Sequence, residues 1–174
     1  KKKILWAVCG SRDVFFGSLF VSTDIPFHLS FFCQGDEVVL PDFTHPATVC
    51  AIVQCGATPV FVDVDAETCN VTSAHFSPAI TRRTRVLLAV SLFGRPCDME
   101  SIMSLAKSHR NLHVVEDAAC SLGSSIQGVR TGKVADVTCF SFHPRKVFTC
   151  GEGGMIVTDD AQVAQRAREC KFFG

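Results

Sequence analysis

The sequence predicts an α/β fold in which a mainly parallel sheet is covered by helices on both sides. Short, β-branched runs alternate with helical patterns along the chain, as in α/β domains. Most of these runs are apolar at consecutive positions, which is typical of strands buried on both faces. Hydrophobic residues make up 47% of the 174 residues and charged residues 20%, a composition that favours one globular domain over disorder.

The predicted strands are short and rich in valine. The first apolar run, Ile4–Cys9, follows three lysines and weakly imitates a signal peptide. Arg12 and Asp13 come shortly after it, so a strand is the better interpretation. Residues 12–34 are rich in phenylalanine but lack a clean period, and no structure is predicted for them. Further strands are predicted at residues 38–40, 60–62, 86–90, 113–115, 137–140 and 155–158.

Helices are predicted at residues 47–54, 98–109 and 161–170. The first has Pro46 near its first turn and Gly56 just beyond its end, the usual positions for these residues. The second can be capped by Asp98 and continues with apolar residues at helical spacing. Neither an internal repeat nor a linker interrupts this alternation, so the chain is interpreted as part of a single domain.

The charge and cysteine content exclude several classes of function. Seventeen basic residues balance seventeen acidic ones, so there is no electrostatic reason to expect nucleic acid or an anionic membrane as a partner. The ten cysteines include no Cys-x-x-Cys pair, which argues against zinc ribbons and thioredoxin-like sites. Most cysteines lie in apolar runs, where a thiol behaves as a small hydrophobe. We therefore expect a reducing, cytoplasmic location.

An acid and a lysine follow neighbouring apolar strands. Asp117 ends one strand, Ser141 ends another, and Lys146 comes shortly before a glycine-rich turn at 151–154. The carboxyl ends of parallel strands meet at one edge of a sheet, so these three side chains are expected to lie together. A pyridoxal phosphate (PLP) site needs this combination, because a lysine holds the cofactor aldehyde as a Schiff base and an acid keeps the ring nitrogen protonated.

Each of these residues has an alternative interpretation. Asp117 could instead cap a helix that follows through Ala118 and Ala119. Side chains alternate along a strand, so Glu116 should point to the opposite face, but the two carboxylates exchange roles if the strand ends one residue early. Without its flanking motif, Lys146 would be read as a solvated surface lysine.

The segments 114–119, 141–146 and 151–154 resemble the DegT/DnrJ/EryC1/StrS family of sugar aminotransferases. The resemblance runs from about residue 35 to the last residue. It implies the large-domain core of a fold type I PLP transferase, with Lys146 as Schiff-base lysine and proton carrier and Asp117 at the pyridinium. It also implies a homodimer that transfers an amino group from an amino acid, such as glutamate, to a nucleotide-linked keto sugar.

The resemblance assigns further residues to the cofactor. Ser141 is expected to bind the phosphate, together with Gly10 and Ser11, which match a Ser-Gly-Thr run of the family in part. His45 occupies the position of the flat side chain that stacks on the ring. Cys120 stands where the family often has a polar amide that contacts the ring oxygen, although a thiol is a weaker hydrogen-bonding group.

Three conclusions follow for the whole chain. Family members continue for roughly as long again, so residues 1–174 are interpreted as a partial large domain, a fragment without the small C-terminal domain. His109 and His113 are four residues apart, but the chain passes from helix to strand between them, and no metal site is predicted. The alternatives are another fold type I PLP enzyme, a lyase or desulfurase, or an incompetent fragment that acts only in binding or oligomerisation.

Overall fold

The computed structural model of the chain describes residues 4–9 and 34–171. Within these ranges the chain forms a seven-stranded sheet and a separate two-stranded hairpin. The strands of the sheet are β1 (Ile4–Cys9), β2 (Glu37–Pro41), β3 (Thr58–Val62), β4 (Thr84–Val90), β5 (His113–Asp117), β8 (Val137–Ser141) and β9 (Gly153–Thr158). The hairpin strands are β6 (Ser125–Ile126) and β7 (Val129–Arg130). The helices are α2 (Pro46–Gln54), α3 (Ser73–Phe76), the short 3₁₀ helix η1 (Ser77–Ala79), α4 (Met99–Lys107) and α5 (Ala161–Lys171).

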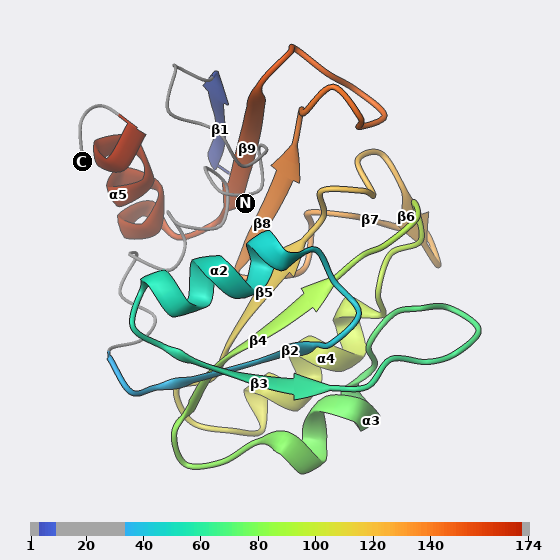
Figure 1. Ribbon diagram of the computed structural model, residues 1–174, viewed down its shortest axis with the longest axis vertical. Helices are drawn as coiled ribbons and strands as arrows, with labels where there is room; N and C mark the ends of the chain where they lie inside the picture. The colour runs from blue at the N-terminus through green and yellow to red at the C-terminus, as the bar shows by residue number, and fades with distance from the viewer. Residues whose placement is uncertain (1–3, 10–33, 172–174) are drawn as a thin grey trace.

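The strands follow the order β1-β9-β8-β5-β4-β2-β3 across the sheet (Figure 1). From β3 to β8 neighbouring strands are parallel, whereas β9 runs antiparallel to β8 and β1 runs antiparallel to β9. The prediction of a mainly parallel sheet is therefore confirmed. The expected strand at Ile4–Cys9 is confirmed as well, at one edge of this sheet.

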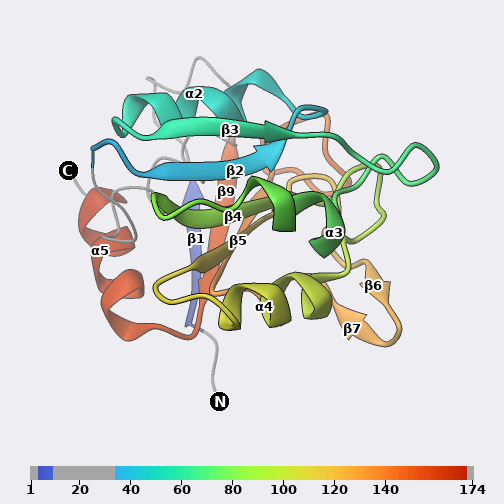
Figure 2. The same cartoon turned by 90° about the horizontal axis from the view of Figure 1, so that it is seen from below.

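Helices cover both faces of the sheet, with α2 above and α4 below it in the view of Figure 2. One core contains residues of α2 and α5 with Val38 and Leu88 of the strands. The other contains residues of α3 and α4 with Val39 and Leu87. Neighbouring residues of one strand thus belong to different cores, and this explains why the strands are apolar at consecutive positions.

The two helices with predicted end signals show those signals in the structure. Gly56 follows α2 with φ at +77°, the left-handed conformation that glycine adopts at low cost, and its N–H donates to the carbonyl of Val53. Asp98 caps α4 by accepting the N–H of Ser101 at 3.1 Å. This helix ends at Lys107 rather than at residue 109, because the chain turns towards β5 through Asn111, whose φ is +58°.

Two short elements lack a readable pattern in the sequence. The helix α3 has only four residues, too few for a period, and is held at its start by Thr72 and His75, which bond each other's backbone and side chains as a capping box. The hairpin β6–β7 turns through Gln127 and Gly128, both at positive φ. Two positive φ values are typical of the two-residue hairpin turn, but Gln-Gly is a weaker signal than Asn-Gly.

Candidate active site

The predicted cofactor residues in the described part of the chain lie at the carboxyl ends of β2, β5 and β8 or in the segments that follow them, and β5 and β8 lie side by side in Figure 1. Asp117 is the last residue of β5 and Ser141 is the last residue of β8, two strands that pair side by side. Lys146 lies in the loop that leaves β8, and His45 lies between β2 and α2. Sequence order alone predicted this meeting for Asp117, Ser141 and Lys146.

Asp117 is a buried carboxylate, only 2% exposed, with two hydrogen-bond donors. Its Oδ1 accepts the N–H of Ala119 at 3.1 Å and its Oδ2 accepts the hydroxyl of Thr48 at 3.2 Å. Burial raises the pKa of Asp117 to about 6, although the Ala119 amide, the charge of Lys146 and the Thr48 hydroxyl all lower it. The residues that follow Asp117 form turns and not a helix, so its bond to Ala119 closes a local turn.

Lys146 is half-buried and its amine contacts the thiol of Cys120. The distance from Nζ to Sγ is 3.3 Å. The loop that carries Lys146 is closed at its base, where the N–H of Phe142 donates to the carbonyl of Gly153 at 2.8 Å. The rings of Phe142 and Phe148 pack edge to face at 5.5 Å. The charge of Lys146 lowers the pKa of Asp117, so the amine lies within electrostatic reach of that carboxylate.

The remaining predicted residues are placed as follows. Ser141 is buried, and its hydroxyl accepts the N–H of His143 at 3.4 Å. His45 is the N-cap residue of α2, where its Nδ1 accepts the N–H of Ala47 at 3.1 Å. This bond orients an exposed imidazole at the edge of the site. Gly10 and Ser11 lie outside the described residues.

Thr48 is a site residue that the sequence patterns did not reveal. It lies in the first turn of α2, is fully buried, and joins that helix to the carboxylate of Asp117. Its hydroxyl also lies 3.0 Å from that of Thr44. A buried threonine on the inner face of a helix is a weak signal by itself. Only the packing of α2 over the end of β5 shows what it contacts.

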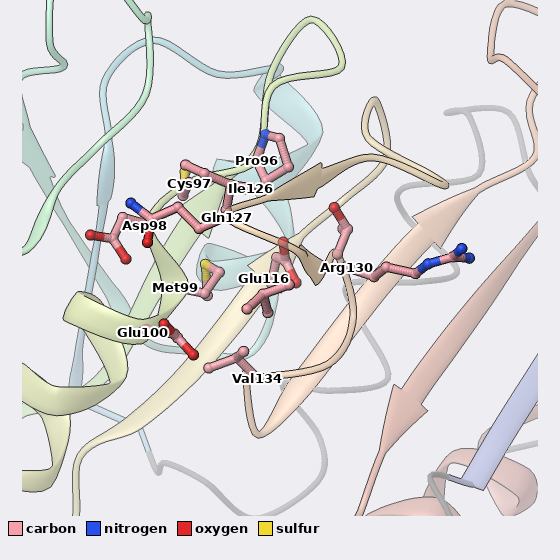
Figure 3. Close-up of a pocket in the computed structure, with 12 residues that line it drawn as sticks. Pro96, Cys97, Asp98, Met99, Glu100, Glu116, Ile126, Gln127, Arg130 and Val134 are labelled. Atoms are coloured by element: carbon pink, nitrogen blue, oxygen red, sulfur yellow. The ribbon is translucent and has the colours of Figure 1, made fainter.

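Glu116 lies on the other face of the sheet, as the alternation of side chains predicted. Its carboxylate accepts the hydroxyl of Ser91 at 3.2 Å, the N–H of Gly132 at 3.0 Å and the hydroxyl of Thr138 at 3.1 Å. Figure 3 shows it between the start of α4 and the hairpin. The cavity there has a volume of about 20 Å³. A cavity of this size holds about one water molecule and is too small for a cofactor.

The carboxylate on the lysine side is therefore Asp117. No group of three His, Cys, Asp or Glu side chains in residues 4–9 and 34–171 is arranged to hold a metal ion. In the same ranges, the helices are too short or too polar to cross a bilayer. The chemistry at this edge thus consists of one amine, one buried acid, a thiol, hydroxyls and an imidazole.

Comparison with known proteins identifies the family. A profile of the DegT/DnrJ/EryC1/StrS aminotransferase family matches residues 25–174. The chain belongs to the DegT/DnrJ/EryC1/StrS aminotransferase family. This family member is 46% identical over 141 residues to the GDP-perosamine synthase of Escherichia coli O157:H7, which covers 81% of this chain and 38% of the relative. It is 45% identical over 141 residues to the UDP-N-acetyl-3-dehydro-alpha-D-glucosamine 3-aminotransferase of Acidithiobacillus ferrooxidans, covering 80% and 38%.

Solved structures of aminotransferases share the fold of this family member. DesV of S. venezuelae, in complex with a ketimine intermediate, superposes with a TM-score of 0.87 and 35% identity over 98% of this chain and 44% of DesV. NtdA of Bacillus subtilis, with bound cofactor PMP, gives a TM-score of 0.81 and 31% identity over 94% and 35%. The predicted fold, the large-domain core of a fold type I PLP enzyme, is confirmed. The chain spans less than half the length of these relatives.

Proposed function

We propose that this chain is part of a PLP-dependent aminotransferase that moves an amino group from an amino acid, such as glutamate, to a nucleotide-linked keto sugar. The proposal is supported by the position of Lys146 in the loop after β8, where its charge acts on the buried carboxylate of Asp117 at the end of the neighbouring strand β5. Family membership supports the reaction class. A fold alone would not, since one fold hosts many activities.

The residues at this edge suit PLP in charge and chemistry. When bound, PLP supplies an electron sink for the carbon that carries the amino group. Asp117 is desolvated and has only neutral hydrogen-bond donors, so it is suited to a cationic ring nitrogen. Lys146 would hold the aldehyde carbon and carry the proton, and Ser141 would donate its hydroxyl to the phosphate. His45 would stack on the ring and Cys120 would face the ring oxygen, while Gly10 and Ser11 are proposed from sequence alone.

The substrate class comes from the names of relatives. One is a GDP-perosamine synthase, and a second is a 3-aminotransferase that acts on a UDP-linked 3-dehydro sugar. A solved structure with a similar fold, DesI, was determined in the presence of its TDP-sugar product. These relatives support a nucleotide sugar as the acceptor here. Glutamate as donor rests on the family resemblance.

We further propose that the full protein is a cytoplasmic homodimer and that this chain forms part of its large domain. Large apolar side chains remain exposed around the site, with Phe43 48%, Phe93 74% and Val147 85% accessible. The rings of Phe43 and Phe93 lie 6.3 Å apart and form a patch that a second subunit could cover. Seven cysteines of the described residues are free thiols, which fits a reducing compartment.

Covalent attachment of PLP tests the site directly. The purified protein is mixed with PLP, reduced with borohydride and digested, and the modified peptide is identified by mass spectrometry. We expect the adduct on Lys146 and its loss in Lys146→Ala. Lys107→Ala, which removes an exposed lysine from the end of α4, is the matched control and should keep the adduct. An adduct formed equally well on Lys146→Ala, or none at all, would refute the site.

A lyase or desulfurase is the second candidate, favoured by the histidine at the stacking position. The Nδ1 atom of the His45 imidazole accepts the N–H of Ala47 at 3.1 Å, at the start of α2. Incubation with glutamate and a keto sugar nucleotide should release 2-oxoglutarate if the protein is an aminotransferase. Release of sulfide from cysteine, without 2-oxoglutarate from glutamate, would instead favour the desulfurase.

A further inference from the structure

A thiol and an amine are in direct contact at the site. The Nζ atom of Lys146 lies 3.3 Å from the Sγ atom of Cys120, with no other atom between them. Cys120 lies in the turn after β5 and Lys146 in the loop after β8, so the fold and not the local sequence creates the pair. Both side chains are half-buried and thus partly accessible to small solutes.

Cys120 differs in its surroundings from the buried cysteines of the described residues. Cys97 and Cys139 are buried, and burial raises the pKa of Cys97 to about 12 and that of Cys139 well above its usual value. Such thiols are inert, because the thiolate is the reactive form. Cys50 and Cys150 are exposed and lie on α2 and in the β8–β9 loop. Cys120 combines access with a nitrogen nucleophile.

We propose that Cys120 and Lys146 form an oxidant-driven covalent pair, in which a peroxide closes a sulfur–nitrogen bond that keeps PLP from Lys146. The first half of this proposal concerns the two side chains alone. The second half, exclusion of the cofactor, rests on the function proposed above. The pair would make cofactor loading sensitive to oxidants in the PLP-free protein.

The chemistry balances with hydrogen peroxide as the only co-reactant. The Cys120 thiol is oxidised by two electrons to a sulfenic acid while hydrogen peroxide is reduced to water. The neutral amine of Lys146 then attacks the sulfenic sulfur. The S–N bond forms, the S–O bond breaks, and the hydroxide leaves with a proton from the nitrogen as water. Two equivalents of a small thiol reverse the reaction and restore the Cys120 thiol and the Lys146 amine.

Bound PLP and the S–N bond exclude each other, because both use the same nitrogen of Lys146. Loading with PLP should therefore protect Lys146 from cross-linking. Cross-linking should in turn prevent the PLP adduct until a thiol reductant is added. The long lysine side chain needs only a small rotation to bring Nζ onto Sγ from hydrogen-bond distance, so the backbone can stay in place.

Peptide mapping of the purified PLP-free protein tests the bond itself. The protein is treated with hydrogen peroxide at mildly alkaline pH, alkylated and digested. We expect a peptide pair joining Cys120 to Lys146, lighter than the two separate peptides by two hydrogens, and its loss after reduction. Cys50→Ser should keep the pair, whereas Cys120→Ser should lose it. Oxidation of Cys120 with Lys146 left free overturns the proposal, as does a cross-link on Lys146 that forms in equal yield in Cys120→Ser.

The yield of PLP attachment tests whether the cross-link between Cys120 and Lys146 excludes the cofactor. Each protein is compared with itself before and after peroxide, by the yield of borohydride-trapped PLP on Lys146. We expect the wild-type yield to be lost after peroxide and regained with a thiol reductant, and the Cys120→Ser yield to be the same before and after. An equal loss of PLP yield in the wild type and in Cys120→Ser would show that the cross-link does not exclude PLP. Absence of PLP attachment in any untreated protein would refute the proposed function, while the cross-link itself is still read from the peptide masses.

Discussion

Asp117 and Glu116 are adjacent acids on the same buried strand, yet their surroundings differ. Asp117 faces α2 and the lysine loop, where it accepts two hydrogen bonds beside the charge of Lys146. Glu116 faces α4 and the hairpin, where it accepts hydrogen bonds from Ser91, Gly132 and Thr138. Asp117 thus lies beside the lysine loop, and Glu116 joins β8 to the residue that follows β4 and to the turn after β7.

The difference shows that burial alone does not mark a functional acid. Both side chains are almost completely buried, at 2% and 0% exposure. What distinguishes them is the face of the sheet on which each lies and the neighbouring amine. On the Glu116 side the backbone is also tightly packed, since a Cβ on Gly132 would lie 2.9 Å from the ring of Phe140. We therefore expect substitution of Asp117 to affect mainly activity, and substitution of Glu116 to affect mainly stability.

The largest expected effect comes from Asp117→Asn. The amide keeps the shape of the side chain but cannot hold a positive ring nitrogen, so transamination should fall about 10²–10³-fold. The fold should be kept, as shown by an unchanged circular dichroism spectrum. Glu116→Gln is the matched control on the opposite face and should retain most of the activity. Equal losses in the two variants would contradict the assignment of roles.

The stability of the protein should depend on pH because of the buried Asp117. Burial raises the pKa of Asp117 from 3.8 to about 6, so the folded protein holds this proton more tightly than the unfolded chain. Its contribution to stability is full below pH 3.8 and is lost as the pH rises to about 6. At about 1.4 kcal/mol per pKa unit, the loss is on the order of 3 kcal/mol.

Urea unfolding of the PLP-free protein at a series of pH values measures this effect. Asp117→Asn serves as the reference, because its amide does not titrate. The difference in unfolding free energy between the two proteins should change within this window and stay constant above it. A difference that does not vary with pH would show that Asp117 is not perturbed.

Glu116→Gln should affect stability more than activity. The amide nitrogen cannot accept a hydrogen bond, so at least one of the donors from Ser91, Gly132 or Thr138 loses its partner. A buried donor without a partner costs about 1–3 kcal/mol. Urea unfolding well above pH 6 should show this loss for Glu116→Gln, whereas Asp117→Asn should be no less stable than the wild type there, because it removes a buried charge. A Glu116→Gln protein as stable as the wild type would contradict the structural role of Glu116.

The smallest effect is expected from Thr48→Val, which keeps the shape of the side chain and removes its hydroxyl. Loss of one hydrogen bond to Asp117 should cost about 1 kcal/mol. It should also move the titration of Asp117 to higher pH, because the Thr48 hydroxyl lowers the pKa of that carboxylate. Thr44→Val, which leaves the bond between Thr48 and Asp117 intact, is the control. If the pKa of Asp117 is the same in Thr48→Val as in the wild type, the proposed contact of Thr48 with Asp117 is wrong.

Much of the fold could be predicted because its signals are local. Apolar runs gave the strands of the sheet, and Gly56 and Asp98 marked helix ends where the structure has them. Elements with weak local signals were missed, namely the four-residue helix α3 and the hairpin with its Gln-Gly turn. No structure was predicted for residues 12–34, and most of them lie outside the described residues.

The sequence by itself determined that this chain is α/β, that Asp117 and Lys146 would share a sheet edge, and that Glu116 would face away. These follow from the two-residue period of strands and from the meeting of parallel strand ends, which are properties of the backbone. Only the tertiary structure decided the strand order, the bond from Thr48 to Asp117 and the contact of Cys120 with Lys146. The residues of these contacts are 69 and 26 positions apart, and what brings them together is the packing of helices and loops on the sheet, which no local pattern encodes.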